Sequence, residues 1–348
     1  MVVGPSSNLD LLRAIAVLLV LAQHLLRRMQ IYHLAWIPTS SLGLFGVLLF
    51  FVHTCLVLMY SMERSQLTGR TLFLNFYVRR IFRIYPLSIL AVAAAVALHL
   101  TSDINGVPGL SVGPLGGKRE IIANFLLIQN LASVKSTVNV LWSLPFELQM
   151  YLVLPFLFLW IRGRRRVWAL LALWLGSVGA AWMQLRFAPL AVLSLLIFVP
   201  HFLPGVIAYS IPHVPRIKSS LWPVFILSLV LLFAVRPTLP VGWVLCLALG
   251  LAIPFFAEIR TGWLRTISNR IATYSYGIYL SHQFCIWFAF AAMAHYPLWL
   301  RISTLVLLLL TLPVVLYHSI ERPMIQVGTR LASRWSEPRV EQVEVAAA

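Results

Sequence analysis

The chain has 348 residues, of which 60% are hydrophobic and only 11% are charged. About a quarter of the residues of a soluble domain are charged, so this composition excludes an ordinary soluble protein and indicates an integral membrane protein. The net charge of +17 is spread over short connections between apolar runs. That distribution argues against nucleic acid as a partner and favours membrane lipids.

The apolar runs predict an all-α polytopic protein, a bundle of about ten transmembrane helices. The runs lie at about 9–26, 42–62, 82–100, 141–161, 167–184, 189–209, 221–235, 239–257, 272–293 and 298–318. Prolines make the sixth to eighth runs the least regular. The segment 101–140 is rich in glycine and proline, which predicts a long loop.

The distribution of lysine and arginine predicts the orientation. With Arg83 and Arg301 counted with the connections that they adjoin, the even-numbered connections and the C-terminal tail carry 18 of these residues, the odd-numbered connections carry 8, and Arg13 lies inside the first run. By the positive-inside rule both termini face the cytoplasm and the loop 101–140 faces outward. No basic region precedes the first run, which we expect to be a retained helix rather than a cleaved signal peptide. Residues 324–348 form a polar cytoplasmic tail, whose first half is expected to lie on the membrane surface as an amphipathic helix.

The first run carries two polar side chains, Arg13 and His24, in an otherwise apolar helix. Eleven residues span nearly three helical turns, so the two share one face about 16 Å apart. Ionisable groups at such depths are costly and by default indicate function, although an arginine and a histidine near opposite interfaces would be tolerated structurally.

Arginines open the third run at Arg79, Arg80 and Arg83. The charge count puts this end on the cytoplasmic side. The three are either an ordinary interfacial anchor or, since arginine suits bidentate phosphate contacts, a clamp for a phosphorylated cytosolic ligand.

Glu147 is the only acid expected well inside an apolar run. A buried carboxyl group needs a partner, a proton or a wet cavity. Glu147 and His24 are expected at similar depth near the outer side, so Glu147 either orients His24 as a base or is an interfacial residue bonded to Ser143.

Histidines and hydroxyl groups mark several other runs. Ser275, Tyr279 and His282 share one face of the ninth run and are candidates to line a pocket. His53 and His201 lie inside the second and sixth runs. No two histidines have metal-ligand spacing with a carboxylate, and the three cysteines lie apart in apolar runs, so no metal site is predicted.

Together these segments resemble the membrane-bound acyltransferase-3 family over nearly the full length, with residues 1–323 as the acyltransferase domain. LDLLRAIAVLLVLAQH resembles the family's opening motif, with Arg13 and His24 at its Arg-x10-His spacing. FGVLLFFVHTCLVL, FYVRRIFRIYP, LWSLPFELQMY, TYSYGIYLSH and SIERPMI resemble five further motifs in the family's order. The sequence departs from the pattern at Leu48, where the family has aspartate, and at Thr54 and Cys55, which replace a serine–glycine pair.

This resemblance implies an enzyme that moves an acyl group, usually acetyl, from acetyl-coenzyme A or another acyl-coenzyme A to a hydroxyl of a carbohydrate or glycoconjugate. It implies the bacterial inner membrane as location. The donor is expected at Arg80, Arg83 and Tyr85, and the chemistry at His24, Glu147 and Arg13. The substrate pocket is expected to be lined by His53, Trp142, Ser143, Ser275, Tyr279 and His282.

Several alternatives stay open at this point. His24 is either the general base of a direct transfer or a nucleophile that is acylated transiently. The same intramembrane His, Glu and Arg residues also fit a proton-coupled transporter. A catalytically inactive family member that acts as a binding subunit is a third possibility.

Overall fold

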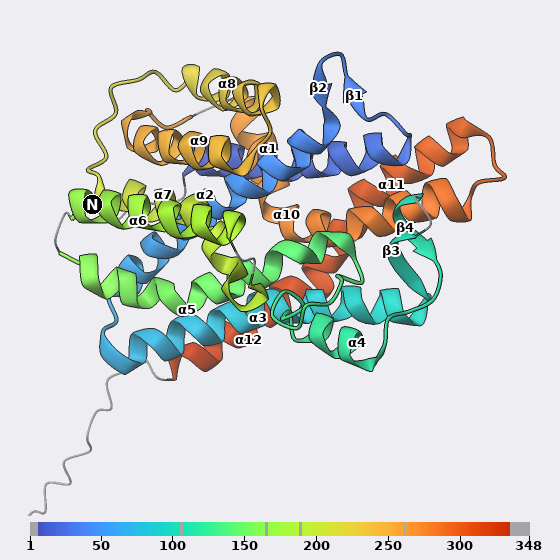
Figure 1. Ribbon diagram of the computed structural model, residues 1–348, viewed down its shortest axis with the longest axis horizontal. Coiled ribbons are helices and arrows are strands. Elements are labelled where there is room, and N and C mark those ends of the chain that lie inside the picture. Colours follow the sequence, from blue (N-terminus) through green and yellow to red (C-terminus); the bar gives the residue numbers. More distant parts are fainter. Residues whose placement is uncertain (1–5, 105–106, 164–165, 188–189, 261, 335–348) are drawn as a thin grey trace, which may run out of the picture.

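A computed structural model describes residues 6–104, 107–163, 166–187, 190–260 and 262–334. Long helices lie side by side along one direction (Figure 1). In chain order the α-helices are α1 (Ser7–Arg28), α2 (Thr39–Ser65), α3 (Gly69–Ala97), α4 (Lys118–Phe125), α5 (Leu144–Ile161), α6 (Val167–Arg186), α7 (Val199–Ser210), α8 (Leu221–Val235), α9 (Leu239–Ala252), α10 (Trp263–Trp287), α11 (Leu298–Leu316) and α12 (Arg322–Ser333). Short helical turns join them: η1 (Asn139–Ser143), η2 (Ala191–Ile197), η3 (Ile253–Phe255), η4 (Phe288–Ala292) and η5 (Tyr317–Glu321).

Among the described residues, six helices are long and apolar enough to cross a membrane: α1, α2, α3, the η1–α5 segment, α6 and the continuous helix from α11 through α12. The pair η2 and α7, bent by 44°, gives a seventh if it is one span. The multi-pass helical fold is therefore confirmed, whereas the count of ten is not reached. The helix α8 and the segment α9–η3 are apolar but short, and α10 carries many polar side chains.

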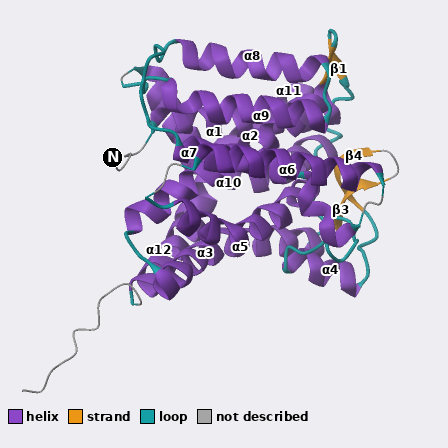
Figure 2. Ribbon diagram, turned by 60° about the vertical axis from the view of Figure 1, so that its left-hand side comes forward, coloured by secondary structure: helices purple, strands orange, loops and turns teal. Residues whose placement is uncertain are grey.

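The helix α2 lies at the centre of the bundle. In its most apolar stretch 72% of the residues are buried, which is expected of a helix that is apolar all round. Figure 2 shows α8 and α9 on one side, α3, α5 and α12 on the other, and α1, α2, α7 and α10 between. A Cβ at Gly46 would lie 2.6 Å from the Ala16 carbonyl oxygen of α1, and one at Gly205 of α7 would meet the Val52 carbonyl oxygen of α2. Glycine therefore permits backbone-to-backbone packing on both sides of α2.

The expected outer loop 101–140 is more structured than the sequence suggests. It contains most of an antiparallel hairpin, β3 (Leu100–Ile104) and β4 (Val107–Val112), and the helix α4. The Asn124 side chain bonds the carbonyl of Lys135 and the amide of Thr137 at 2.9 Å each. These bonds fold the end of the loop back into the bundle, where Val138 and Val140 are buried. A second, smaller hairpin pairs β1 (His33–Leu34) with β2 (Ile37–Pro38).

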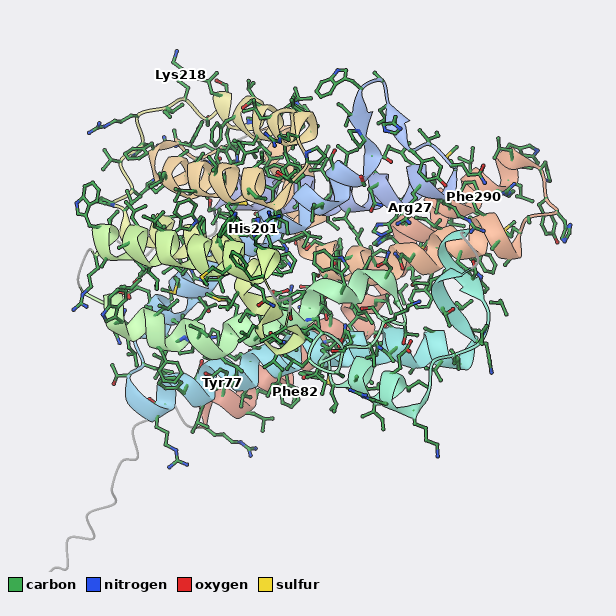
Figure 3. All side chains as sticks on the ribbon, viewed as in Figure 1. Arg27, Tyr77, Phe82, His201, Lys218 and Phe290 are labelled. Atoms are coloured by element: carbon green, nitrogen blue, oxygen red, sulfur yellow. The ribbon has the colours of Figure 1, made fainter. Side chains whose placement is uncertain are left out.

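Two predicted helix boundaries are wrong. The third helix begins at Gly69 rather than near residue 82, so the arginine cluster lies inside it. The last run does not end at 318, because η5 and α12 continue it to Ser333. The first part of the expected polar tail is thus helical, but it packs along α3, where Gly328 meets the Phe82 side chain. Figure 3 places Phe82 on this side of the bundle. Residues 335–348 lie outside the described residues.

Candidate functional site

A cavity of about 110 Å³ lies within the bundle among α1, α2, α3, α5 and α10. We call it the central cavity. Its polar lining is Arg13, His53, Thr54, Arg80, Arg83, Ser143, Glu147, Tyr151, Ser275, Tyr276 and Tyr279. Most of the residues that the sequence singles out therefore meet at one place, although they come from five separate helices.

Three guanidinium groups dominate this cavity. Arg80 lies eleven residues after the start of α3, about 16 Å along its axis, so it is deep in the bundle and not at the interface as expected. Arg83, one turn further, forms an ion pair of 2.8 Å with the fully buried carboxylate of Glu321. Arg13 faces the same space from α1. With one carboxyl group among three arginines in the lining, the cavity favours an anionic or strongly polar ligand.

Glu147 lies in the first turn of α5 and accepts a hydrogen bond from Tyr151, one turn further along that helix. Arg13 and Arg80 line the same cavity as this carboxyl group. Glu147 and Arg13 line the same central cavity, whereas His24 lines a different cavity. The expected pairing of Glu147 with His24 is therefore not found.

Hydroxyl groups form another wall of the central cavity. Tyr279 donates to the Val140 carbonyl oxygen at 2.7 Å and lies 2.8 Å from the Ser143 hydroxyl. Tyr276, from the same helix, donates to the Ile84 carbonyl oxygen at 2.7 Å. These bonds tie α10 to the arginine helix α3 and to η1, and they hold the cavity open between the helices.

His24 lies beyond this wall, next to His282. Nδ1 of His24 is 3.3 Å from Nε2 of His282, and the ring centroids are 5.0 Å apart. Nδ1 of His24 is 2.9 Å from the Val20 carbonyl oxygen, and Nδ1 of His282 is 2.9 Å from that of Ile278. A carbonyl oxygen only accepts, so each neutral ring carries its proton on Nδ1 and its basic nitrogen is Nε2. Backbone carbonyls, not Glu147, fix the tautomer of His24.

A second and much smaller cavity, of about 10 Å³, adjoins His24. We call it the outer cavity, because it lies at the end of the bundle that carries the β3–β4 hairpin. Its lining is His24, Arg28, Gly109, Leu110, Gln283, Ile286 and Trp287. Figure 3 shows Arg27, which precedes Arg28 in α1, at the same end of the bundle as Phe290 and far from Lys218.

A third cavity lies toward the opposite end, between the last turns of α2 and the first turns of α3. It is lined by Ser61, Met62, Ser65, Leu72, Asn75, Phe76, Arg79 and Arg80. Arg80 also lines the central cavity, so the two spaces adjoin at its side chain. The polar features of the bundle are thus arranged from end to end, from the α2–α3 cavity through the arginines to the histidine pair.

A family model described as an acyltransferase domain matches residues 6–319. The chain belongs to the acyltransferase-3 family. No curated protein and no solved structure matches it. The family and the apolar helices together support a membrane acyltransferase.

The acyltransferase-3 motifs do not all reach the central cavity. Arg13, Arg80, Arg83, Ser143 and Glu147 do. Tyr85 instead donates to the Leu126 carbonyl oxygen at 3.0 Å, and Trp142 packs against Phe198 with ring centroids 5.6 Å apart.

Among the remaining expected pocket residues, His53, Ser275 and Tyr279 line the cavity, whereas His282 contacts His24.

The departure at Leu48 has a structural counterpart in this acyltransferase-3 chain. Leu48 is fully buried. A Cβ added to Gly242 would lie close both to the Cδ1 atom of Leu48 and to the Nε2 atom of His201, so these two side chains are near each other. Both ring nitrogens of His201 are buried without a hydrogen-bond partner in the described part of the chain. Figure 3 shows His201 in the interior of the bundle. An apolar side chain thus stands beside an unsatisfied imidazole where the family has a carboxylate.

Sequence reasoning missed Glu321. It is 2% exposed and pairs with Arg83, so Glu147 is not the only acid inside the bundle. Glu321 is the glutamate of the SIERPMI motif. Because the last apolar run was expected to end at residue 318, Glu321 was expected outside the last span. Within the described residues no group of three or more His, Cys, Asp or Glu side chains is arranged to hold a metal ion.

Proposed function

We propose that this protein is an O-acyltransferase of the bacterial inner membrane that moves an acyl group, in the simplest case acetyl, from acyl-coenzyme A to a hydroxyl group of a carbohydrate acceptor. The observation that carries the proposal is the order of polar groups along the bundle. Three arginines surround a buried cavity that adjoins one end through Arg80, and a histidine pair lies beyond Tyr279 toward the other end. The arginine-lined cavity suits a charged donor, and the region of the histidine pair suits a neutral acceptor.

The donor fits the arginine side. The distribution of lysine and arginine supports a cytoplasmic position for the α2–α3 end, on the side where acyl-coenzyme A is available. Arg79 lines the α2–α3 cavity and meets the anionic portion of the donor. Arg80, Arg83 and Arg13 then face the part that enters the bundle. The acyl end extends past Tyr279 toward His24.

The chemistry fits the histidine side. Nε2 of His24 takes the proton of the acceptor hydroxyl while its oxygen attacks the thioester carbonyl carbon. The carbon–sulfur bond breaks, the new carbon–oxygen ester bond remains, and the proton passes from His24 to the departing coenzyme A thiolate. His282 and the Val20 carbonyl hold the imidazole in the required tautomer. In the alternative route His24 is acylated first and the acceptor then attacks the acyl-imidazole.

The test is transfer from radiolabelled acetyl-coenzyme A by purified protein in lipid nanodiscs with a panel of glycans. His24→Ala is compared with wild type and with His33→Ala, a histidine of the exposed β1 strand. We expect label on a glycan with wild type and His33→Ala, and a loss of about 10²–10⁴-fold with His24→Ala. A wild type that neither binds acetyl-coenzyme A nor labels any glycan contradicts the proposal. Trapped label on His24 distinguishes the two-step route from direct transfer.

A further inference from the structure

Gln283 is buried in a place where its amide has nothing to bond. The residue is 2% exposed, and both its Oε1 and its Nε2 are without a hydrogen-bond partner in the described part of the chain. A buried unsatisfied amide costs free energy, and such groups are rare in native structures unless a ligand or water satisfies them. Gln283 follows His282 in α10 and lines the outer cavity with His24.

The outer cavity has the size of a single oxygen-bearing group. About 10 Å³ is close to the space that one water molecule or one hydroxyl group needs. A hydroxyl group both donates and accepts a hydrogen bond, which matches the amide of Gln283 with its free donor and free acceptor. A carboxylate or phosphate accepts only and would leave Oε1 unsatisfied.

The surroundings of the cavity suit a sugar ring beyond that hydroxyl. Trp287, one helical turn after Gln283, lines the cavity and is only partly buried, so its indole offers an apolar face. Arg28 lines the same cavity from the last turn of α1 and donates to the Phe290 carbonyl oxygen at 3.4 Å. An aromatic face beside amide and guanidinium donors is the combination that binds a polyhydroxylated ring with one hydroxyl inserted.

We infer that Gln283 and the outer cavity form the acceptor subsite, in which the hydroxyl to be acylated is hydrogen-bonded to the Gln283 amide beside His24, with Trp287 against the sugar ring. This inference rests on the proposed function, since it assigns the acceptor of that reaction. It adds Gln283 and Trp287 to the residues that touch substrate. It also separates the acceptor side from the central cavity, in which the donor is held.

The decisive variant is Gln283→Met, which keeps the length of the side chain and removes the amide. Because the amide is unsatisfied without acceptor, its loss should leave the melting temperature of the ligand-free protein unchanged or raise it. It should raise the KM for the acceptor by about tenfold or more, while binding of acetyl-coenzyme A stays as in wild type. The acceptor used is the glycan that wild type acylates in the panel above.

The matched control is Gln184→Met in α6. Gln184 is also buried, but its amide donates to the Leu190 carbonyl oxygen at 2.7 Å. This variant should lower the melting temperature and leave the acceptor KM unchanged. Trp287→Phe should raise the acceptor KM less than Trp287→Ala does.

The outcomes separate the two proposals. A Gln283→Met protein that acylates the glycan with wild-type KM overturns the acceptor subsite and leaves the proposed function standing. A lowered melting temperature with unchanged KM shows that Gln283 is structural, which also overturns it. A wild type with no acetyl-coenzyme A binding and no transfer contradicts the proposed function, and the inference falls with it.

Discussion

The central cavity and the outer cavity are built on opposite principles. The central cavity collects three guanidinium groups, and two carboxyl groups lie beside them in Glu147 and Glu321. The outer cavity holds one oxygen-sized space beside an imidazole and an unsatisfied amide. The first is suited to hold charge and the second to move a proton. Tyr279 and His282, with ring centroids 6.3 Å apart, lie between them.

The largest effect should come from the ion pair behind the central cavity. Glu321→Gln removes the buried carboxylate that pairs with the partly exposed Arg83 guanidinium, so the free energy of unfolding should fall by roughly 3 kcal/mol. The double variant Arg83→Met with Glu321→Met should be more stable than either single variant, because no unpaired charge remains. Thermal unfolding in nanodiscs measures both. Equal stability of Glu321→Gln and wild type would show that the ion pair does not hold Arg83 in place.

The next effect concerns the donor alone. Arg80→Ala should raise the KM for acyl-coenzyme A by about 30-fold, since a hydrogen bond to a charged group contributes roughly 2 kcal/mol. The acceptor KM should stay unchanged. The control is Arg330→Ala, an exposed arginine of α12. If Arg80→Ala shifted the acceptor KM and not that of the donor, the assignment of the two regions would be reversed.

A smaller effect is expected at the wall between the regions. Tyr279→Phe removes the bond to Val140 and the contact with Ser143, and should lower the free energy of unfolding by about 1 kcal/mol. The turnover rate should fall while both KM values change little, because Tyr279 borders the path of the acyl group and binds neither end. Tyr296→Phe, at an exposed tyrosine, is the control. Steady-state kinetics with both substrates varied separates these parameters.

The smallest effect should come from a buried histidine outside both regions. His201→Leu removes an imidazole whose nitrogens have no partner in the described structure, so stability should be unchanged or slightly higher. Transfer should stay within about twofold of wild type, a change below half a kcal/mol. A large loss of transfer would mean that His201 and the neighbouring Leu48 belong to the reaction, and the division into two regions would be too simple.

The sequence predicts the helical membrane fold and most of the central cavity because those depend on residue type and helical spacing. Arg13 and His24 lie on one uninterrupted helix, as their spacing predicts. Arg80 and Arg83 were expected at an interface because charges end an apolar run in any hydropathy profile. In the structure, partners such as Glu321 allow the helix to carry them inside.

Whether Glu147 contacts His24 could not be judged from the sequence, because the answer depends on where along the bundle α5 begins. Asn124 ties the preceding loop inward, and that long-range set of bonds lowers the start of α5 into the bundle. The pairing of His24 with His282 depends equally on how α1 packs against α10. The local periodicity of the sequence predicts neither arrangement.

The helix α1 has a further consequence for how the two regions act together. It contains no proline or glycine, whereas α3, α5, α7 and α11 each contain an internal proline. Its N-terminus is tied to Glu258, which accepts from the Ser6 hydroxyl at 2.6 Å and from the Asn8 backbone N–H at 3.1 Å. Sharp kinks arise mainly at such interruptions, so we expect α1 to stay unkinked between Arg13 and His24. If an arriving donor displaces Arg13, we expect the displacement to reach His24, about 16 Å along the same helix.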